Sequence, residues 1–440
     1  MRVRHSCAAM LIAALLGTAG PASAQTPDVQ ALQQEIAQLR QELAAVQQQY
    51  GERLSALEAK LGTAAPSVVP TLDAAPQTTV EVPQTTVEVP PGAAGAGGPS
   101  GSLPVYGTAT ASSKIFNPDI AVIGNFLGAA GRNRVNPSPA LEMPESEASF
   151  QAIVDPYARA DFFMAFGEEG VDLEEGVLTF PAIPGGLLVK VGKMRAAFGK
   201  VNTLHSHMIP WTDRPLVTDN LVGGEEGIAD AGLSAARLIS NPWLFLEATG
   251  QVYRGDSGDI FHSNKRGDLS YVGHLRAYQD LSDDTNVDLG LSYARGHNAA
   301  GLIDDVDEGR FATDLWGIDA TVRWRPLQRA IYNSILGRAE VIWSRRDQFG
   351  GRERALGYYG SADYQLGRRW FLGGRFDRSQ RAMDAALRDS GGSLVLTYWP
   401  SEFSQVRGQY RHTRYAEGES ANELLFQFQF SIGAHGAHPF

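Results

Sequence analysis

Hydrophobic and polar residues alternate along the last strand-like segment of the chain, residues 424–432. Four apolar side chains fall on one face of this segment: Phe426, Phe428, Phe430 and Ile432. Polar side chains fall on the other: Gln427, Gln429 and Ser431. An outer strand of a water-soluble sandwich would bury the aromatic face, whereas a closed barrel in a bilayer turns that face to lipid and the polar face to a lumen. The rest of the chain must separate these two interpretations.

The same period of two continues from residue 114 to the C-terminus and predicts an all-β region of about sixteen antiparallel strands. Residues 148–166 alternate without a break, and a turn at 155–157 keeps the same face apolar and makes the strand count even. The predicted strands are 117–128, 147–154, 157–166, 171–180, 187–195, 230–240, 243–254, 269–281, 286–298, 312–325, 331–346, 355–366, 369–379, 389–399, 403–415 and 421–433.

The connections between these strands differ in length on the two sides. With a periplasmic N-terminus, the turns on the periplasmic side are mostly short, and the opposite side carries the long connections 129–145, 196–229, 255–268 and 299–311. This asymmetry is typical of a transmembrane β-barrel. We therefore predict a membrane barrel over residues 114–440.

Three different segments precede the barrel. Residues 1–24 have a basic start, a short apolar run and a small-residue cleavage site, which predicts a secretory signal peptide. Residues 25–61 predict a periplasmic α-helical coiled coil, and residues 62–113, rich in Pro and Gly, predict a flexible linker. The apolar seam of the coiled coil consists of Leu32, Ile36, Leu39, Leu43, Val46, Tyr50, Leu54, Leu57 and Leu61.

Composition narrows the classes of function. Cys7 is the only cysteine and leaves with the signal peptide, so the mature chain has neither disulfides nor a cysteine nucleophile. Removal of the signal peptide also takes away Arg2 and Arg4 and changes the formal net charge from −11 to −13, which argues against nucleic acid as a partner. No later segment reaches the roughly 18 apolar residues of a membrane helix.

The longest connection, residues 196–229, carries many charged and imidazole side chains, and a loop of this length is usually functional. We expect it to fold inward and constrict the pore. The candidate constriction residues are Lys200, His205, His207, Asp213, Arg214, Asp219, Glu225 and Glu226.

The sequence around this loop resembles the phosphate-selective porin O and P family. The matching stretches are Val191-Gly-Lys-Met-Arg-Ala-Ala-Phe198-Gly199, Arg214-Pro-Leu-Val217, Gly227-Ile228 and Gly232-Leu-Ser234. The terminal Phe440 also resembles the assembly signal of bacterial outer-membrane barrels. The resemblance implies a sixteen-stranded porin whose third extracellular loop enters the lumen.

The alternation of each strand places both acidic and basic side chains toward the lumen. In the phosphate-selective family, by contrast, the resemblance implies a dense series of arginines and lysines in the pore. Because pore selectivity follows the charges that line it, this mixture argues against phosphate specificity. The predicted lumen-lining residues are Glu247, Arg276, Asp280, Asp288, Asp319, Arg323, Arg338, Glu340, Arg375, Asp377, Arg407 and Arg411.

His205 and His207 lie on one face of an extended segment and are candidate metal ligands, with Asp213 as a third. Ordinary loop histidines are the simpler interpretation. A second pair, His435 and His438, lies near the C-terminus. We expect no cofactor, and no nucleotide-binding or hydrolase motif stands in a convincing context, which predicts a protein that is not an enzyme.

The sequence thus predicts a bacterial outer-membrane porin for passive diffusion of small hydrophilic solutes or ions. Two alternatives remain: a zinc-uptake receptor, and a structural anchor that tethers the envelope through the coiled coil, with periplasmic or cell-wall contacts. Beyond membrane lipid, a homotrimer is the expected assembly, because a three-stranded coiled coil would match a threefold arrangement of barrels.

Overall fold

The computed structural model describes residues 118–433, except 168–169, 259, 304–305 and 308–309. The predicted signal peptide, coiled coil and linker lie outside the described residues, as do His435 and His438. No helix in the described part of the chain is long and apolar enough to span a membrane.

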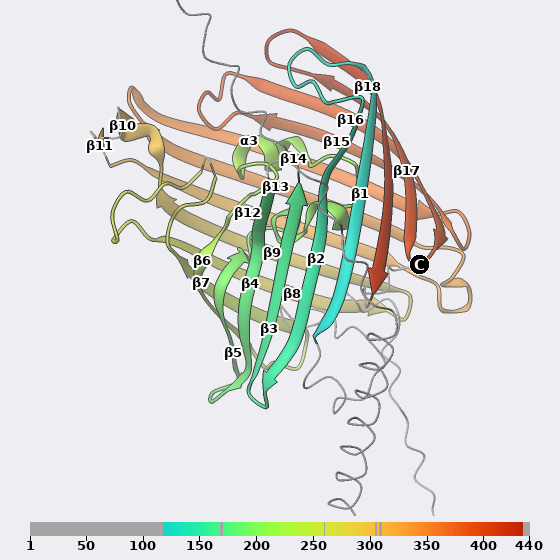
Figure 1. Ribbon diagram of the computed structural model, residues 1–440, viewed down its shortest axis with the longest axis horizontal. Helices are drawn as coiled ribbons and strands as arrows, with labels where there is room; N and C mark the ends of the chain where they lie inside the picture. Colours follow the sequence, from blue (N-terminus) through green and yellow to red (C-terminus); the bar gives the residue numbers. More distant parts are fainter. Residues whose placement is uncertain (1–117, 168–169, 259, 304–305, 308–309, 434–440) are drawn as a thin grey trace, which may run out of the picture. The chain divides into compact units, whose positions relative to one another are not determined.

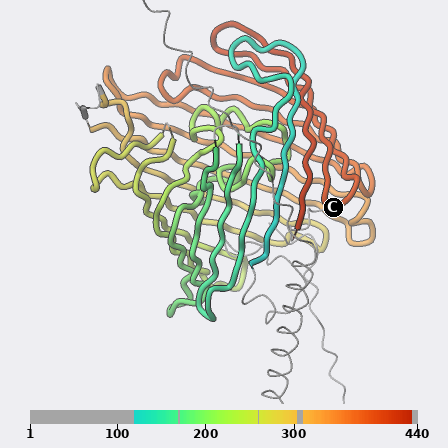
Figure 2. Tube along the Cα trace, in the orientation of Figure 1, coloured from blue at the N-terminus to red at the C-terminus, as the bar shows by residue number. Residues whose placement is uncertain are grey.

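Sixteen antiparallel strands close into a barrel, as predicted (Figure 1). Each strand pairs with the next one of the ring, and β1 pairs with β18 to complete it, so the first and last strands run side by side in Figure 2. A separate two-stranded sheet, β10 (Leu302–Ile303) and β11 (Val306–Asp307), lies in the connection after β9. The barrel strands are β1 (Asp119–Arg132), β2 (Leu141–Asp155), β3 (Ala158–Gly167), β4 (Gly170–Ile183), β5 (Leu187–Arg195), β6 (Ala229–Leu238), β7 (Phe245–Tyr253), β8 (Ser270–Ser282), β9 (Thr285–His297), β12 (Ala312–Trp324), β13 (Ile335–Gln348), β14 (Gly351–Gln365), β15 (Trp370–Gln380), β16 (Arg388–Ser401), β17 (Ser404–Arg414) and β18 (Ser420–Gly433).

Some predicted boundaries are wrong. The first long connection is shorter than predicted, 133–140, because β2 already begins at Leu141, opposite Gly128, and β1 continues to Arg132 along β18. β13 begins at Ile335 and not at residue 331, since a short 3-10 helix, η4 (Leu327–Arg329), occupies the turn before it. The predicted turn around Pro156 is confirmed, because β2 ends at Asp155 and β3 begins at Ala158.

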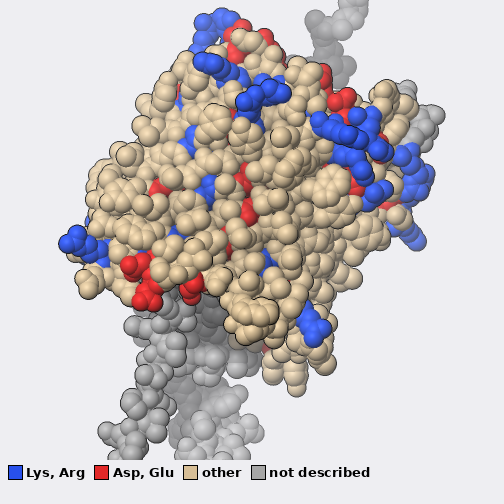
Figure 3. Space-filling view, turned by 180° about the vertical axis from the view of Figure 1, so that it is seen from behind, with Lys and Arg blue, Asp and Glu red and all other residues tan. Residues whose placement is uncertain are grey.

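The faces of the strands have the orientation predicted for a membrane barrel. In β18, Phe426 and Phe428 are exposed, whereas Gln427 and Gln429, which alternate with them, are buried at 1% and 2% exposure. β9 repeats the pattern, since its Leu289 is exposed. Most of the outer wall seen in Figure 3 consists of uncharged residues. Apolar side chains therefore cover the outside of the ring, and polar ones turn inward.

The interior is nevertheless not entirely polar. An apolar cluster forms where the segment between β5 and β6 packs against inward side chains of the wall, and it includes Phe198, Trp211, Leu221, Leu315, Ile342 and Tyr359. The inner wall therefore carries apolar side chains such as Leu315, Ile342 and Tyr359 beside the predicted polar ones. The burial of this cluster attaches the segment to one part of the inner wall.

Candidate functional site

The segment from Ala196 to Ile228, here called the inner loop, connects β5 to β6. It contains two short 3-10 helices, η1 (Val201–Thr203) and η2 (Ser206–Met208), and one short α-helix, α3 (Leu216–Leu221). α3 lies within the ring of strands in Figure 1 and packs against β13, β14, β15 and β16. The longest connection of the sequence thus lies against the inner wall.

Asn202 closes the base of the inner loop. Its side-chain amide donates to the carbonyl oxygens of Ala196, at 2.9 Å, and Ile228, at 3.1 Å. Its side-chain oxygen accepts from the backbone N–H of Ile228 at 2.8 Å. Asn202 is 2% exposed, so these bonds are shielded from water. The sequence analysis missed this residue, because the local sequence pattern does not indicate which side chain will hydrogen-bond to both ends of a loop.

Backbone N–H groups of the inner loop donate to polar side chains of widely spaced strands. Ala197 donates to Gln251 of β7 at 2.7 Å, and Gly199 donates to Ser292 of β9 at 2.9 Å. Thr212 donates to Gln409 of β17 at 2.9 Å, and Leu216 to Asp377 of β15 at 3.3 Å. The inward polar side chains therefore supply the hydrogen bonds that an irregular segment cannot make within itself.

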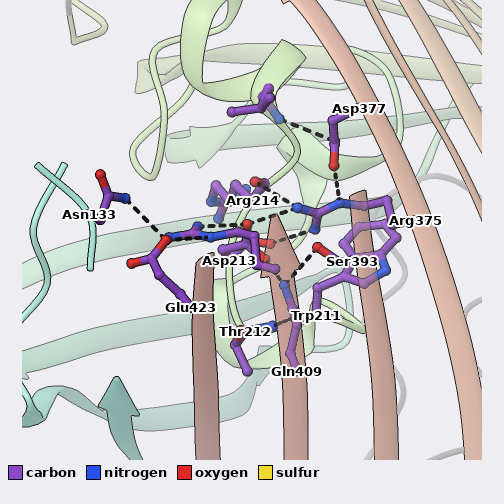
Figure 4. A network of polar contacts seen from close by, with 12 residues as sticks. Asn133, Trp211, Thr212, Asp213, Arg214, Arg375, Asp377, Ser393, Gln409 and Glu423 are labelled. Carbon is purple, nitrogen blue, oxygen red and sulfur yellow. Dashed lines mark hydrogen bonds and ion pairs between the residues drawn. The ribbon is translucent and has the colours of Figure 1, made fainter. Parts of the chain in front are cut away.

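Asp213 is the centre of the ionic network in Figure 4. Its carboxylate lies 2.8 Å from the guanidinium of Arg375 and 2.9 Å from that of Arg411, and it accepts from Gln409 at 2.5 Å. Burial alone would raise the pKa of Asp213, but the two guanidinium groups hold it below its usual value. The suggestion that Asp213 is a third metal ligand beside the histidine pair is wrong, because its oxygens bind these arginines.

Carboxylates of the wall complete the network. Asp377 contacts Arg375 at 2.7 Å, and Glu423 contacts Arg411 at 2.7 Å. Each arginine therefore bridges the inner loop and a carboxylate of the barrel, so most of the charge is paired locally. Glu423 was absent from the predicted set, although the alternation of β18 places it on the same inward face as Gln427 and Gln429.

Two further predicted arginines hold the loop backbone. Arg407 donates to the carbonyl oxygens of Ile209, at 3.1 Å, and Trp211, at 2.9 Å. Arg214 donates to the carbonyl oxygen of Leu204 at 2.9 Å and thus stays within the inner loop. Both are buried, which gives them a structural part in holding the loop.

The remaining predicted residues, apart from the two histidines, fall into four groups. Lys200 lies 3.6 Å from Asp288, which also pairs with Arg276 at 2.6 Å. Buried carboxylates of the inward face are Glu247, Asp319 and Glu340, and half-buried arginines are Arg323 and Arg338, the latter paired with Asp363. Exposed carboxylates are Asp219, Glu225, Glu226 and Asp280.

The structure brings His205 together with three glutamates that the sequence analysis did not assign to it. Its Nδ1 lies 2.5 Å from Glu174 and 2.9 Å from Glu147, and its Nε2 lies 3.7 Å from Glu175. Burial alone would lower the pKa of His205, but hydrogen bonds to these carboxylates raise it well above its usual value. His207 is also buried, with Nδ1 3.6 Å from Glu147.

A cavity of about 430 Å³ lies beside this cluster. Basic and acidic side chains face it together, and Glu174 belongs both to its wall and to the His205 cluster. The other charged residues that line it are Asp172, Lys193, Arg195, Glu226, Asp230, Arg254 and Asp256. The cavity thus gives polar ligands a route to the inner loop.

Comparison with known proteins places this fold. No family model matches the chain, so the resemblance to the phosphate-selective porins stays a prediction. An uncharacterized protein of Aquifex aeolicus (strain VF5) is 27% identical over 399 residues, covering 77% of this chain and 83% of that protein.

Solved structures of outer-membrane proteins share the architecture. The anion-selective porin from Comamonas acidovorans superposes with a TM-score of 0.51 at 12% identity, covering 72% of this chain and 99% of the porin. A loop L8 deletion mutant of OmpT, an outer membrane protein of Vibrio cholerae, superposes with a TM-score of 0.50 at 9% identity, covering 72% of this chain and 99% of that one. The chain therefore has the barrel fold of outer-membrane porins.

Proposed function

We propose that this protein is an outer-membrane porin through which small hydrophilic solutes or ions diffuse passively. The inner loop forms the constriction, and Lys200, Asp219, Glu225 and Glu226 present its charges to the passing solute. The observation that carries this proposal is the inverted distribution of side chains in a closed ring, exemplified by exposed Phe428 beside buried Gln429. Lipid can cover such an outer wall, and the polar side chains of the inner wall are those expected on the lumen side of a channel.

The selectivity of the proposed channel is weak. Ion pairs such as Arg375 with Asp377 and Arg276 with Asp288 neutralise much of the charge on the inner wall. A phosphate-selective pore would need basic side chains in excess along the path. We therefore propose a general diffusion channel.

The constriction is static in this proposal. Apolar packing of Phe198, Trp211 and Leu221 and the ionic network of Asp213 both oppose movement of the inner loop. In this proposal, solute passes beside the inner loop, along polar side chains of the inner wall against which the apolar cluster does not pack. A channel of this kind gives a steady current without frequent closures.

Single-channel recording in a planar lipid bilayer tests the proposal. The purified full chain should give uniform steps of current, and a salt gradient across the bilayer should give a reversal potential close to zero. A strong preference for phosphate would instead support the selective porins that the sequence resembles. If the folded, inserted protein carries no current and releases no small solute from vesicles, the proposed function is wrong.

The assembly is proposed from the sequence. The heptad pattern of residues 25–61 favours a homotrimer with three periplasmic helices. Chemical crosslinking of the detergent-extracted protein should trap a trimer, and deletion of residues 30–61 should abolish it. If the deletion leaves solute flux intact but weakens the envelope, the coiled coil acts as a tether in addition to the pore.

A further inference from the structure

A cluster of metal-ligating side chains lies between the inner loop and the wall, away from the Asp213 network. Carboxylate oxygens of Glu147 and Glu174 and a ring nitrogen of His205 all lie within 4.8 Å of one another. Glu147 comes from β2, Glu174 from β4 and His205 from the inner loop, so three distant segments converge on one point. The cluster is well shielded, with exposed side-chain fractions of 4%, 12% and 12% respectively.

We propose that Glu147, Glu174 and His205 bind one divalent transition-metal ion of the zinc type, which fastens the inner loop to β2 and β4. An imidazole nitrogen with two carboxylate oxygens is a donor set that zinc accepts in proteins, and the nitrogen ligand disfavours calcium and magnesium. This inference is independent of the proposed channel function, since it concerns binding and not passage.

The backbone of β4 is arranged to aim two successive glutamates at the histidine. Phe163 of β3 pairs with Glu175, and the next pair joins Met164 to Leu173, so Glu174 is the extra residue of a β-bulge. In a regular strand, neighbouring side chains point to opposite faces. The bulge lets Glu174 and Glu175 both reach the ring of His205. Bulges that redirect a side chain in this way are frequent beside functional sites.

Oxygens of both glutamates lie close to the same ring nitrogen of His205. Oxygens of Glu147 and Glu174 lie 2.9 Å and 2.5 Å from the same Nδ1 atom, and one N–H group cannot point at both. A metal ion can bind both oxygens and the nitrogen together. With metal–ligand distances of about 2.0–2.2 Å, the donor atoms need to separate only to roughly 3.3 Å.

The surroundings of the cluster favour a cation. Carboxylates of Glu147, Glu174 and Glu175 are contacted by the imidazoles of His205 and His207 and by the guanidinium of Arg195. Because imidazoles bind metal in their neutral form, three negative charges face one positive charge when the ion binds. The backbone N–H of Arg195 donates to Glu175 at 2.7 Å, and its guanidinium lies 3.5 Å from Glu174. Such outer contacts orient ligating carboxylates and tune their affinity.

His207 is placed to act as a fourth ligand. Its ring centroid lies 5.7 Å from that of His205, and its Nδ1 lies 3.6 Å from the Glu147 oxygen that contacts His205. Two imidazoles on one tetrahedral zinc ion have ring centroids roughly 5 Å apart, given zinc–nitrogen distances of about 2.0–2.1 Å. The cavity of about 430 Å³, whose wall includes Glu174, gives the ion access from solvent.

Titration of the full chain in detergent with zinc chloride tests the proposal. The chain with H435A and H438A, which removes the second histidine pair of the sequence, should still bind one Zn²⁺ per chain. In that background, E174Q and H205A should each weaken binding at least about 10-fold. His262→Ala is the matched control, because His262 lies 3.5 Å from the carboxylate of Asp256 and takes no part in the proposed site, so its loss should leave binding unchanged.

Cobalt substitution provides a second measurement that does not depend on how well the E174Q and H205A variants fold. Co²⁺ bound to the H435A/H438A chain should show the visible absorption of a four-coordinate site with nitrogen and oxygen ligands. Absence of that absorption, absence of zinc binding, or equal zinc affinity in the H205A variant and the H262A control would overturn the site. Zinc binding without any current in a bilayer would keep the site and reject the channel, and current without zinc binding would do the reverse.

Discussion

Asp213 of the inner loop and Arg375 of β15 form an ion pair of 2.8 Å in which the arginine side chain is 1% exposed. The same guanidinium lies over the ring of Trp211, 4.8 Å from its centroid, and Trp211 packs edge-on against Tyr359. Charge pairing, cation–π contact and apolar packing thus meet within three successive loop residues. This region holds the proposed constriction in place.

Replacement of Asp213 by Asn should loosen the inner loop and shift ion preference toward anions. The change removes one carboxylate from two guanidiniums, which still keep Asp377 and Glu423. The loss in unfolding free energy should therefore be about 3 kcal/mol, the lower end for breaking a buried pair. Reversal potentials and urea unfolding measure both effects.

Glu226→Gln is the control for this change. It removes a carboxylate charge from an exposed position of the same loop and should leave stability within about 0.5 kcal/mol of the parent. Equal stability of the two variants would show that the Asp213 pair contributes nothing.

The contribution of Asp213 should persist through mildly acid pH. Its pKa in the folded chain lies below the usual value of about 3.9. The stabilisation is therefore complete above that value and disappears only as the pH falls through the lower folded pKa. The difference in unfolding free energy between the parent and D213N should stay constant from about pH 5 to pH 6, below the value of about 7 to which desolvation and the Asp213 carboxylate raise the pKa of Asp219, and it should shrink in strong acid. A difference that vanishes near pH 6 would contradict the lowered pKa.

The barrel could be predicted from the sequence because each wall strand repeats a local pattern. A period of two, as in Phe426 to Gln429, identifies both the strand and its lipid face. The same pattern could not reveal the interior cluster. Leu315 and Trp316 are both apolar and adjacent, and only the structure shows that Leu315 packs inside with 0% exposure.

The contacts of the candidate site could not be predicted for a different reason. Asp213 meets arginines that lie more than 160 residues away along the chain. The bulge at Glu174 breaks the period on which the strand prediction rests. The inner loop itself was recognisable from its length and charges, but its partners depend on the closure of the ring.

Gly199→Ala should displace the start of the inner loop. Gly199 has φ +60, and a Cβ there would overlap the carboxylate of Glu340. Backbone strain and overpacking together should cost about 1–3 kcal/mol. Gly224→Ala is the matched control, since Gly224 has φ +66 but open space where a Cβ would lie. Hydrogen exchange of residues 196–204 should increase in G199A and stay unchanged in G224A.

Trp211→Ala should turn a steady channel into a noisy one. Trp211 is 1% exposed, and its removal should cost about 3–5 kcal/mol in unfolding free energy. Trp243→Ala is the matched control, because Trp243 is 78% exposed in the turn between β6 and β7 and lies outside the interior cluster. Open-channel current noise should rise in W211A and not in W243A. Quiet recordings from W211A would mean that the apolar cluster does not restrain the inner loop.

Substitution of an outer-wall residue by arginine tests whether lipid surrounds the barrel, because a buried charge in lipid lowers the unfolding free energy. Leu291 lies at the middle of β9 and is 52% exposed, so the proposed membrane would cover it at its centre. L291R should therefore lower the unfolding free energy in phospholipid vesicles by about 2–4 kcal/mol.

Tyr157, which is 77% exposed in the turn between β2 and β3, lies at an end of the barrel, where an arginine costs only about 0–1 kcal/mol. The two variants add the same charge to exposed positions and differ only in depth. In urea titrations of vesicle-inserted protein, L291R should unfold at a lower urea concentration than Y157R. Coincident curves would mean that the apolar outer face does not lie in lipid, and the proposed channel would lose its physical basis.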